Sequence, residues 1–140
     1  MRQITDHIVS GDQAVQLTIE VLDEPGQGGA NHLYRITGLD VGKNPSYEPC
    51  AGEKPGNYDG PEDAQWVVFQ NGPIKEFGVN GVTQEALLAI VIDRLRSFQA
   101  GPFASNYNKQ ALFHCEVALQ WLQKRTLERI KRGVEGTNQK

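Results

Sequence analysis

The chain has 140 residues and a formal net charge of −3, and a length of this order suits one domain. The acidic balance argues against a protein that binds long nucleic acid through charge alone, although a local basic cluster could hold a small anion. No apolar run approaches the roughly 18 residues that a membrane span needs, and the first residues lack the apolar core of a signal peptide. We therefore expect a single cytosolic domain over residues 1–140, with no membrane partner.

The first half of the chain alternates apolar and polar residues, which is the period-two pattern of half-buried strands. Residues 14–22 and 31–39 are two such runs, and the turn-forming residues 23–30 separate them. The glycines at 26–29 superficially resemble a phosphate-binding loop. They precede a strand and lack the Lys-Ser/Thr ending of that motif, so a plain hairpin loop is the favoured interpretation.

A long loop and two further strands are expected next. Residues 41–64 are polar and are interrupted by several prolines and glycines, so they cannot hold a long regular element. A third strand is predicted at 65–70 and a short fourth at 74–77, with Asn71-Gly72 as a two-residue hairpin turn. The result is an antiparallel β region over residues 1–80, with three to five strands.

The apolar period changes from two to 3.6 residues at Gly81, which predicts a helical hairpin over 81–133 and a C-terminal tail over 134–140. The first helix begins after Thr83 as N-cap and ends at Phe98, and the second covers 106–131. Arg132-Gly133 supplies a helix stop. The predicted fold class is α+β, a small antiparallel sheet followed by a long helical hairpin.

The hairpin carries more apolar surface than two helices can bury against each other. Apolar side chains surround nearly the whole first helix, and the second has an apolar seam with steps of three and four residues. The seam consists of Leu112, Cys115, Leu119, Leu122, Thr126 and Ile130. We therefore expect the hairpin to dimerise.

The turn between the two helices is the first candidate binding region. It combines aromatic rings, side-chain amides and free N–H groups at a helix start, which suit a purine ring and a phosphate. The alternative is that the aromatic residues plug the end of the hairpin and the polar residues cap the second helix. The candidate ligand-binding residues here are Phe98, Gln99, Gly101, Phe103 and Asn108.

Arg125 and Arg129 form the second candidate region, because their i, i+4 spacing puts two guanidinium groups on one helix face, as a pyrophosphate clamp requires. The alternative is a solvated helix end that pairs with Glu128 or interacts with the helix dipole. Asn108 lies 17 residues before Arg125, about 25 Å along a helix at 1.5 Å per residue. One chain's arginines therefore cannot reach its own turn. Two antiparallel hairpins in a two-fold dimer would bring the two regions together, twice.

No enzymatic centre can be named from the residues. The three histidines, His7, His32 and His114, are scattered among elements of different type, and no carboxylate pair has a spacing suited to acid–base chemistry. We expect no catalytic residues, no metal ligands and no cofactor.

The second half of the chain resembles the phage family of Thoeris anti-defence and anti-CBASS sponges, which share a helical hairpin. The likeness covers about half of the chain closely and the N-terminal strands more loosely. It is carried by residues 69–76, 78–83, 85–95 and 98–103, together with Trp121-Leu122, Arg125-Thr126 and residues 132–137.

The resemblance implies a non-catalytic protein that captures nucleotide second messengers of bacterial immunity in the cytoplasm of the infected host. In the Thoeris branch the ligand is glycocyclic ADP-ribose, and some members also bind cyclic trinucleotides at separate pockets in a trimer of dimers. The family's ligand contacts fall on Phe98, Asn108, Arg125 and Arg129. Where members often have Cys-Arg-Glu-Asn after the turn, this chain has Ser-Asn-Tyr-Asn at 105–108.

Two other functions are weighed against the sponge. A phage structural or assembly module would use the same apolar hairpin for oligomerisation only. An enzyme that cleaves cyclic nucleotides is the weaker rival, because no base, metal cluster or activated nucleophile supports it.

Overall fold

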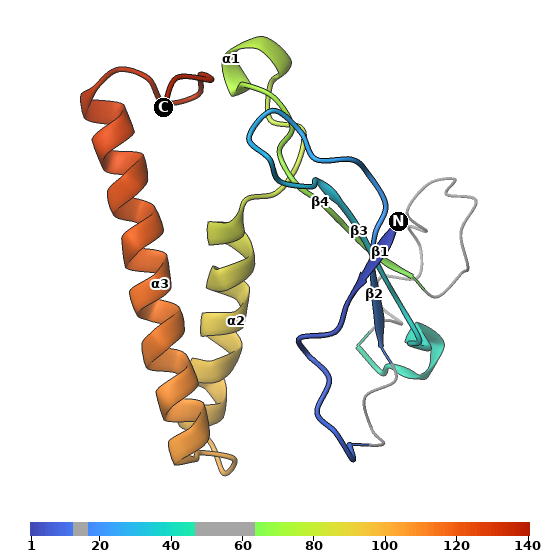
Figure 1. The fold of residues 1–140 in the computed structure, drawn as a ribbon. Helices are drawn as coiled ribbons and strands as arrows, with labels where there is room; N and C mark the ends of the chain where they lie inside the picture. Colours follow the sequence, from blue (N-terminus) through green and yellow to red (C-terminus); the bar gives the residue numbers. More distant parts are fainter. Residues whose placement is uncertain (13–16, 47–63) are drawn as a thin grey trace. The chain divides into compact units, whose positions relative to one another are not determined.

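A computed structural model of the protein describes residues 1–12, 17–46 and 64–140 (Figure 1). These residues form two compact units, Met1–Val68 and Phe69–Lys140, each of which is described by itself. Within the described ranges, none of the helices is both long enough and apolar enough to cross a membrane. The expectation of a single domain stays a prediction.

The N-terminal unit is a four-stranded antiparallel sheet, as expected from the alternating pattern, with strand order β1-β2-β3-β4 (Figure 1). The strands are β1 Arg2–Ile4, β2 Thr18–Val21, β3 Leu33–Thr37 and β4 Gln65–Val68. The prediction of strands at 14–22, 31–39 and 65–70 is thus confirmed with narrower bounds, and residues 14–16 lie outside the described ranges. β1 was not expected, because three residues are too few for a periodic pattern.

The register of the sheet places a charged row on one of its faces. Glu20 is opposite Arg35, and Arg35 is opposite Trp66. The Nε and Nη2 atoms of Arg35 donate to Glu20 Oε2 at 2.9 and 2.7 Å, and the guanidinium lies 5.8 Å from the centre of the Trp66 ring. Val21, one residue further along β2, points to the other face and is fully buried.

The connection between β2 and β3 is a plain hairpin loop, as expected. The Asp23 carboxylate accepts the main-chain N–H groups of His32 and Leu33 at 2.8 and 3.0 Å, which closes the loop at its base. Further out, Gly26 N–H donates to Ala30 O at 2.8 Å. Of the predicted 41–64 loop, the structure describes a short 3-10 helix, η1 (Val41–Lys43), and residues 47–63 lie outside the described ranges.

The predicted strand at 74–77 is wrong, because these residues form a single helical turn, α1 (Ile74–Phe77). Pro73 precedes it with a φ of −64°, and its carbonyl accepts the N–H of Phe77 at 2.9 Å. The expected Asn71-Gly72 hairpin is also absent, since Gln70 N–H donates to Val82 O at 3.0 Å. In a run of four residues, apolar side chains at the first and fourth positions are as compatible with one helical turn as with a short strand.

Side-chain amides hold together the two ends of the segment 70–80, which precedes the long helices of the second unit. The Gln70 amide donates to Gly78 O at 2.8 Å, and the Asn80 side chain both accepts from Asn71 N–H at 2.9 Å and donates to Asn71 O at 2.7 Å. The chain then passes so close to itself that a Cβ at Gly81 would lie 2.3 Å from the carbonyl carbon of Phe69. Glycine is therefore required at position 81.

The predicted helical hairpin is confirmed, with α2 at Gln84–Gln99 and α3 at Asn106–Lys131 (Figure 1). Thr83 is the N-cap of α2, accepting Ala86 N–H at 3.2 Å, and Ser105 is the N-cap of α3, accepting Asn108 N–H at 3.1 Å. These two hydroxyls start the helices where the sequence pattern places them.

Much of the apolar surface of the hairpin remains uncovered. Among the described residues of α2 and α3, only Ile92 is a buried apolar side chain, and most of the predicted α3 seam is half-buried. The exposed apolar residues of the two helices are Ile90, Val91, Phe98, Tyr107, Phe113, Trp121, Leu127 and Ile130. Dimerisation, which would cover part of this surface, stays a prediction.

The end of α3 is a Schellman motif, as the Arg132-Gly133 stop predicts. Gly133 has a φ of +69° and donates its N–H to Ile130 O at 3.0 Å, and Val134 N–H donates to Arg129 O at 3.0 Å. The left-handed residue turns the chain sharply back. The tail therefore lies against the C-terminal end of α3.

Candidate functional site

The turn end of the hairpin uses its amide side chains to hold its own shape. Gln99 Oε1 accepts Ser105 N–H at 3.0 Å, and Asn108 Nδ2 donates to Phe103 O at 3.4 Å. Gly101 N–H donates to Phe98 O at 3.2 Å, so this glycine lies inside the turn. The predicted amides are thus brought together.

The aromatic rings at the same end present free surface. Phe103 is 74% exposed and Tyr107 is also exposed, while Phe98 is partly covered by the Arg94 guanidinium, 5.6 Å from its ring centre. Flat, exposed rings are suited to stacking against a purine, and the cation beside Phe98 adds a positive charge at this end.

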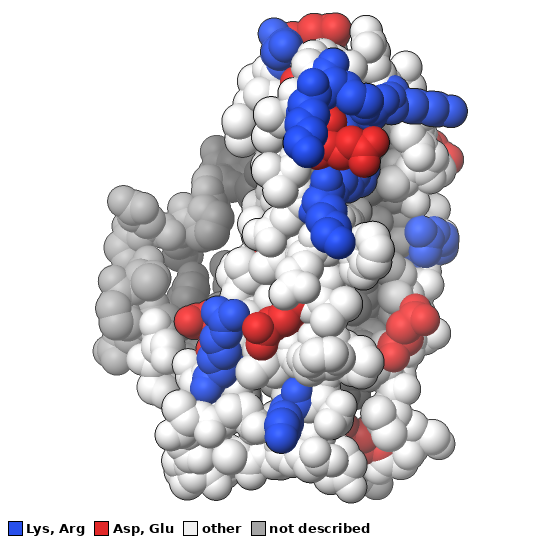
Figure 2. All heavy atoms as spheres, turned by 90° about the vertical axis from the view of Figure 1, so that its left-hand side faces the viewer, with Lys and Arg blue, Asp and Glu red and all other residues white. Residues whose placement is uncertain are grey.

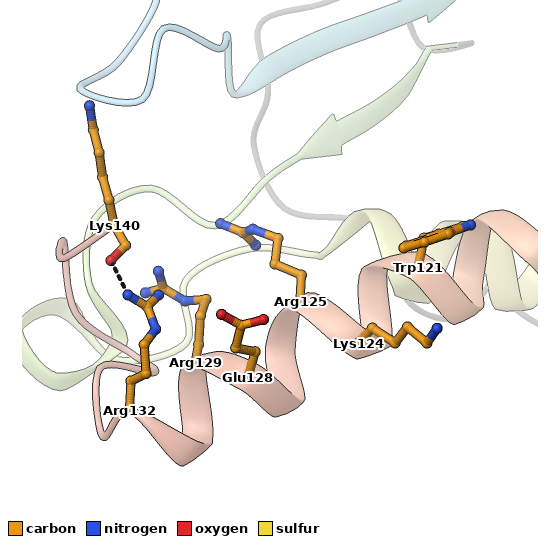
Figure 3. Close-up of a pocket in the computed structure, with 7 residues that line it drawn as sticks. All are labelled: Trp121, Lys124, Arg125, Glu128, Arg129, Arg132 and Lys140. Atoms are coloured by element: carbon orange, nitrogen blue, oxygen red, sulfur yellow. Dashed lines mark hydrogen bonds between the residues drawn. The ribbon is translucent and has the colours of Figure 1, made fainter.

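The opposite end of the hairpin holds a pocket of about 540 Å³ (Figure 3). Figure 2 shows Lys and Arg side chains gathered over the end of α3. The pocket is lined by Trp121, Lys124, Arg125, Glu128, Arg129, Arg132 and Lys140. Five cations and one carboxylate therefore face a cavity large enough for a small anionic molecule.

Arg125 is a cation in this pocket that is free to bind a ligand. Its side chain is exposed, and within the described residues it makes no hydrogen bond and no ion pair. Figure 3 shows it on the same side of α3 as Trp121, one helical turn away, as i, i+4 spacing requires. Trp121 is 66% exposed, and Lys124 Nζ lies 4.7 Å from the centre of its ring. A phosphate at Arg125 would thus lie beside an aromatic surface.

Arg129 also lines the pocket, but the tail occupies most of its donors. Its Nε donates to Glu135 Oε2 at 2.9 Å, and its Nη1 to Gln139 O at 2.6 Å. Its Nη2 donates to Val134 O at 3.0 Å and to Thr137 O at 3.1 Å. The side chain is 12% exposed. The two arginines predicted as a clamp share one pocket, although they are engaged very differently.

Five pocket residues were absent from the predicted site: Trp121, Lys124, Glu128, Arg132 and Lys140. The i, i+4 spacing of Trp121 and Arg125 is the signal in the sequence that could have added Trp121 to the site. Lys140 could not have been found, because only the folded tail brings it to the pocket.

The two candidate regions lie at opposite ends of one continuous helix, because α3 runs unbroken from Asn106 to Lys131 (Figure 1). The 17 residues from Asn108 to Arg125 correspond to about 25 Å. A small ligand at one end cannot touch the other end of the same chain.

Comparison with known proteins identifies the hairpin. Residues 63–127 match the family model for the Acb2/Tad1 hairpin domain. Over these residues the chain is similar to the Acb2/Tad1 hairpin family. A stretch of 74 residues is 53% identical to Thoeris anti-defense 1 of Bacillus phage SBSphiJ7, and it covers 53% of this chain and 52% of that protein. The chain thus matches about half the length of this relative.

The part of the chain that matches the Acb2/Tad1 hairpin domain includes the turn, Trp121 and Arg125, and ends at residue 127. Arg129, Arg132 and the tail lie beyond it. In this hairpin, the described residues hold no group of three or more His, Cys, Asp and Glu side chains that could bind a metal ion.

Proposed function

We propose that the protein is a phage anti-defence protein that captures nucleotide second messengers of bacterial immunity, with glycocyclic ADP-ribose as the principal ligand. The observation that carries the proposal is the basic pocket at the end of α3, with the exposed Trp121 and the unpaired Arg125, in an Acb2/Tad1 hairpin. The related phage protein is itself named for Thoeris anti-defence. The protein acts in the cytoplasm of the infected host.

The chemistry of the ligand fits the groups that the hairpin offers. A pyrophosphate carries two negative charges, and Arg125 can donate two parallel N–H groups to it. The aromatic rings of Phe98 and Phe103, at the turn, supply stacking surfaces for a base. Holding the ligand by charge and stacking leaves it unaltered, which is what sequestration requires.

The binding site is completed across a two-fold dimer. The phosphate-binding end and the aromatic end are about 25 Å apart in one chain. Two antiparallel hairpins place the turn of one protomer beside the arginine end of its partner, and this contact also covers exposed apolar residues such as Trp121 and Leu127. Two identical sites result. Cyclic trinucleotides are a second ligand class, at separate pockets of a trimer of dimers.

Binding and chemical fate of the ligand are tested together. The purified protein is titrated with glycocyclic ADP-ribose by calorimetry, and the bound ligand is then released by denaturation and weighed by mass spectrometry. We expect saturable binding near one ligand per chain and recovery of the unchanged mass. Recovery of a hydrolysed product would replace the proposal with an enzyme, and the absence of heat would leave the hairpin as an assembly module.

A further inference from the structure

Glu128 contributes a carboxylate to the basic pocket at the end of α3. Its neighbours on the helix surface are cations: Lys124 and Arg132 lie four residues before and after it. Arg125 lies three residues before it, and Figure 3 shows both side chains on the same side of α3. This spacing favours an ion pair between the carboxylate and one of these cations.

None of these ion pairs forms within the described residues, where the Glu128 carboxylate also makes no side-chain hydrogen bond. Its two neighbours at i−4 and i+4 are engaged elsewhere. Lys124 Nζ lies 4.7 Å from the centre of the Trp121 ring. Arg132 Nη1 donates to the main-chain oxygen of Lys140 at 2.6 Å, as the dashed line in Figure 3 shows. The carboxylate therefore has free capacity to accept hydrogen bonds from a ligand.

A carboxylate is unfavourable in a pocket that binds phosphate alone. Like charges repel, so Glu128 weakens the binding of a bare pyrophosphate relative to a pocket of cations only. A ligand can offset this repulsion if it also carries hydrogen-bond donors, because an ionised carboxylate accepts hydrogen bonds and cannot donate them. The hydroxyl groups of a ribose are such donors. The pocket is therefore better suited to a nucleotide than to a free phosphate.

The covalent structure of ADP-ribose brings such a donor close to Glu128. A single methylene group separates each phosphate from a ribose ring, so a pyrophosphate held at Arg125 carries ribose hydroxyls with it. Glu128 and Arg125 are three residues apart on one helix, which places their Cβ atoms about 5–6 Å apart. In dinucleotide-binding folds an acidic side chain near the pyrophosphate likewise accepts a ribose hydroxyl, and those that take a phosphate at that position use an arginine instead.

We propose that Glu128 is a specificity-determining residue of this pocket: its carboxylate accepts a hydrogen bond from a ribose hydroxyl of a pyrophosphate-bridged nucleotide and disfavours bare phosphates. The inference rests on the proposed function, because it concerns which ligands the pocket of that function selects. The cations of the pocket attract any phosphate, whereas Glu128 selects for the sugar.

Calorimetric titration with two ligands separates this role from that of a merely repelling charge. Glycocyclic ADP-ribose carries ribose hydroxyls, and inorganic pyrophosphate carries none. Glu128→Ala should weaken binding of glycocyclic ADP-ribose about five- to fiftyfold, because a hydrogen bond to a charged acceptor is lost. The same variant should bind pyrophosphate about two- to fivefold more tightly, because the repulsion is removed.

Glu128→Gln separates the hydrogen bond from the charge, since the amide keeps one acceptor oxygen. It should bind pyrophosphate as tightly as Glu128→Ala does, and its affinity for glycocyclic ADP-ribose should lie between those of the native protein and Glu128→Ala. Both variants are expected to fold, because the Glu128 side chain is exposed and has no partner to lose within the described residues.

Glu116→Ala is the matched control. Glu116 is a carboxylate of the same helix that does not line the pocket, and it lies 12 residues before Glu128, about 18 Å along α3. Its partner Arg96 is 63% exposed, so the loss of their ion pair is tolerated. This variant should change the affinity for either ligand less than about twofold.

Equal or tighter binding of glycocyclic ADP-ribose in Glu128→Ala would overturn the inference and leave the proposed function intact, because the carboxylate would then act only as a repelling charge. If the native protein does not bind glycocyclic ADP-ribose at all, the proposed function fails and the inference falls with it.

Discussion

Replacement of Arg125 by alanine should weaken ligand binding without destabilising the protein. The guanidinium is exposed and has no hydrogen bond or ion pair within the described residues, so its removal leaves no partner unsatisfied. We expect the free energy of unfolding to change by less than about 0.5 kcal/mol.

The expected loss of affinity follows from the hydrogen bonds that Arg125 would donate. A hydrogen bond to a charged group contributes about 1.5–3 kcal/mol, and each 1.4 kcal/mol is a factor of ten, so Arg125→Ala should weaken binding about 10- to 150-fold. Arg125→Lys keeps the charge but loses the bidentate geometry, so its affinity for the ligand should lie between those of the native protein and Arg125→Ala.

The assay is calorimetric titration with glycocyclic ADP-ribose at constant ionic strength, because screening changes the charge contribution. Lys131→Ala is the matched control, since Lys131 is a cation in the last turn of the same helix that does not line the pocket. It should change the affinity less than about threefold. Equal affinities for Arg125→Ala and Lys131→Ala would refute a specific phosphate contact at Arg125.

Three further predictions concern stability. Gly81→Ala should lower the free energy of unfolding by about 2–3 kcal/mol in urea, because its Cβ would overlap the Phe69 carbonyl, while Gly28→Ala, with open space around it, should change it by under about 0.5 kcal/mol. Ser105→Ala should cost about 1 kcal/mol through the lost cap of α3; an unchanged urea midpoint would show that the Asn108 N–H is satisfied otherwise. Partial burial acts to raise the pKa of Asp23, but hydrogen bonds from His32 and Leu33 outweigh it and leave the pKa below its ordinary 3.8. A lowered folded-state pKa stabilises the fold above pH 3.8, and this stabilisation disappears as the pH falls through the folded value, so urea midpoints should fall on acidification in the native chain and by less in Asp23→Asn.

The long elements follow from local signals in the sequence. Thr83 and Ser105 are N-cap residues directly before apolar-periodic runs, and Gly133 ends the second run, so the bounds of α2 and α3 agree with the prediction within a residue. The short elements do not carry such signals. A three-residue strand such as β1 depends on pairing with β2, and the four residues of α1 fit either period.

Likewise, only part of the candidate site could be predicted from the sequence. The i, i+4 spacing of Arg125 and Arg129 puts both side chains on one face of α3, and both line the same pocket. Their role as a ligand clamp stays a prediction. The hydrogen bonds of Arg129 depend on where the carbonyl groups of Val134, Thr137 and Gln139 lie. The residue types of the tail do not predict the course of its main chain. The contribution of the tail therefore became visible only in the folded chain.

Complementation between two defective variants tests the shared site most directly. Phe98→Ala damages the turn end and Arg125→Ala the arginine end, so each homodimer has two defective sites. In a mixed dimer, one site combines both defects and the other combines the two intact ends. When equal amounts are co-refolded, half of the dimers are mixed, and about a quarter of the sites should bind glycocyclic ADP-ribose with full affinity. Full-affinity binding that does not rise above that of the separate variants would contradict a site shared between two chains.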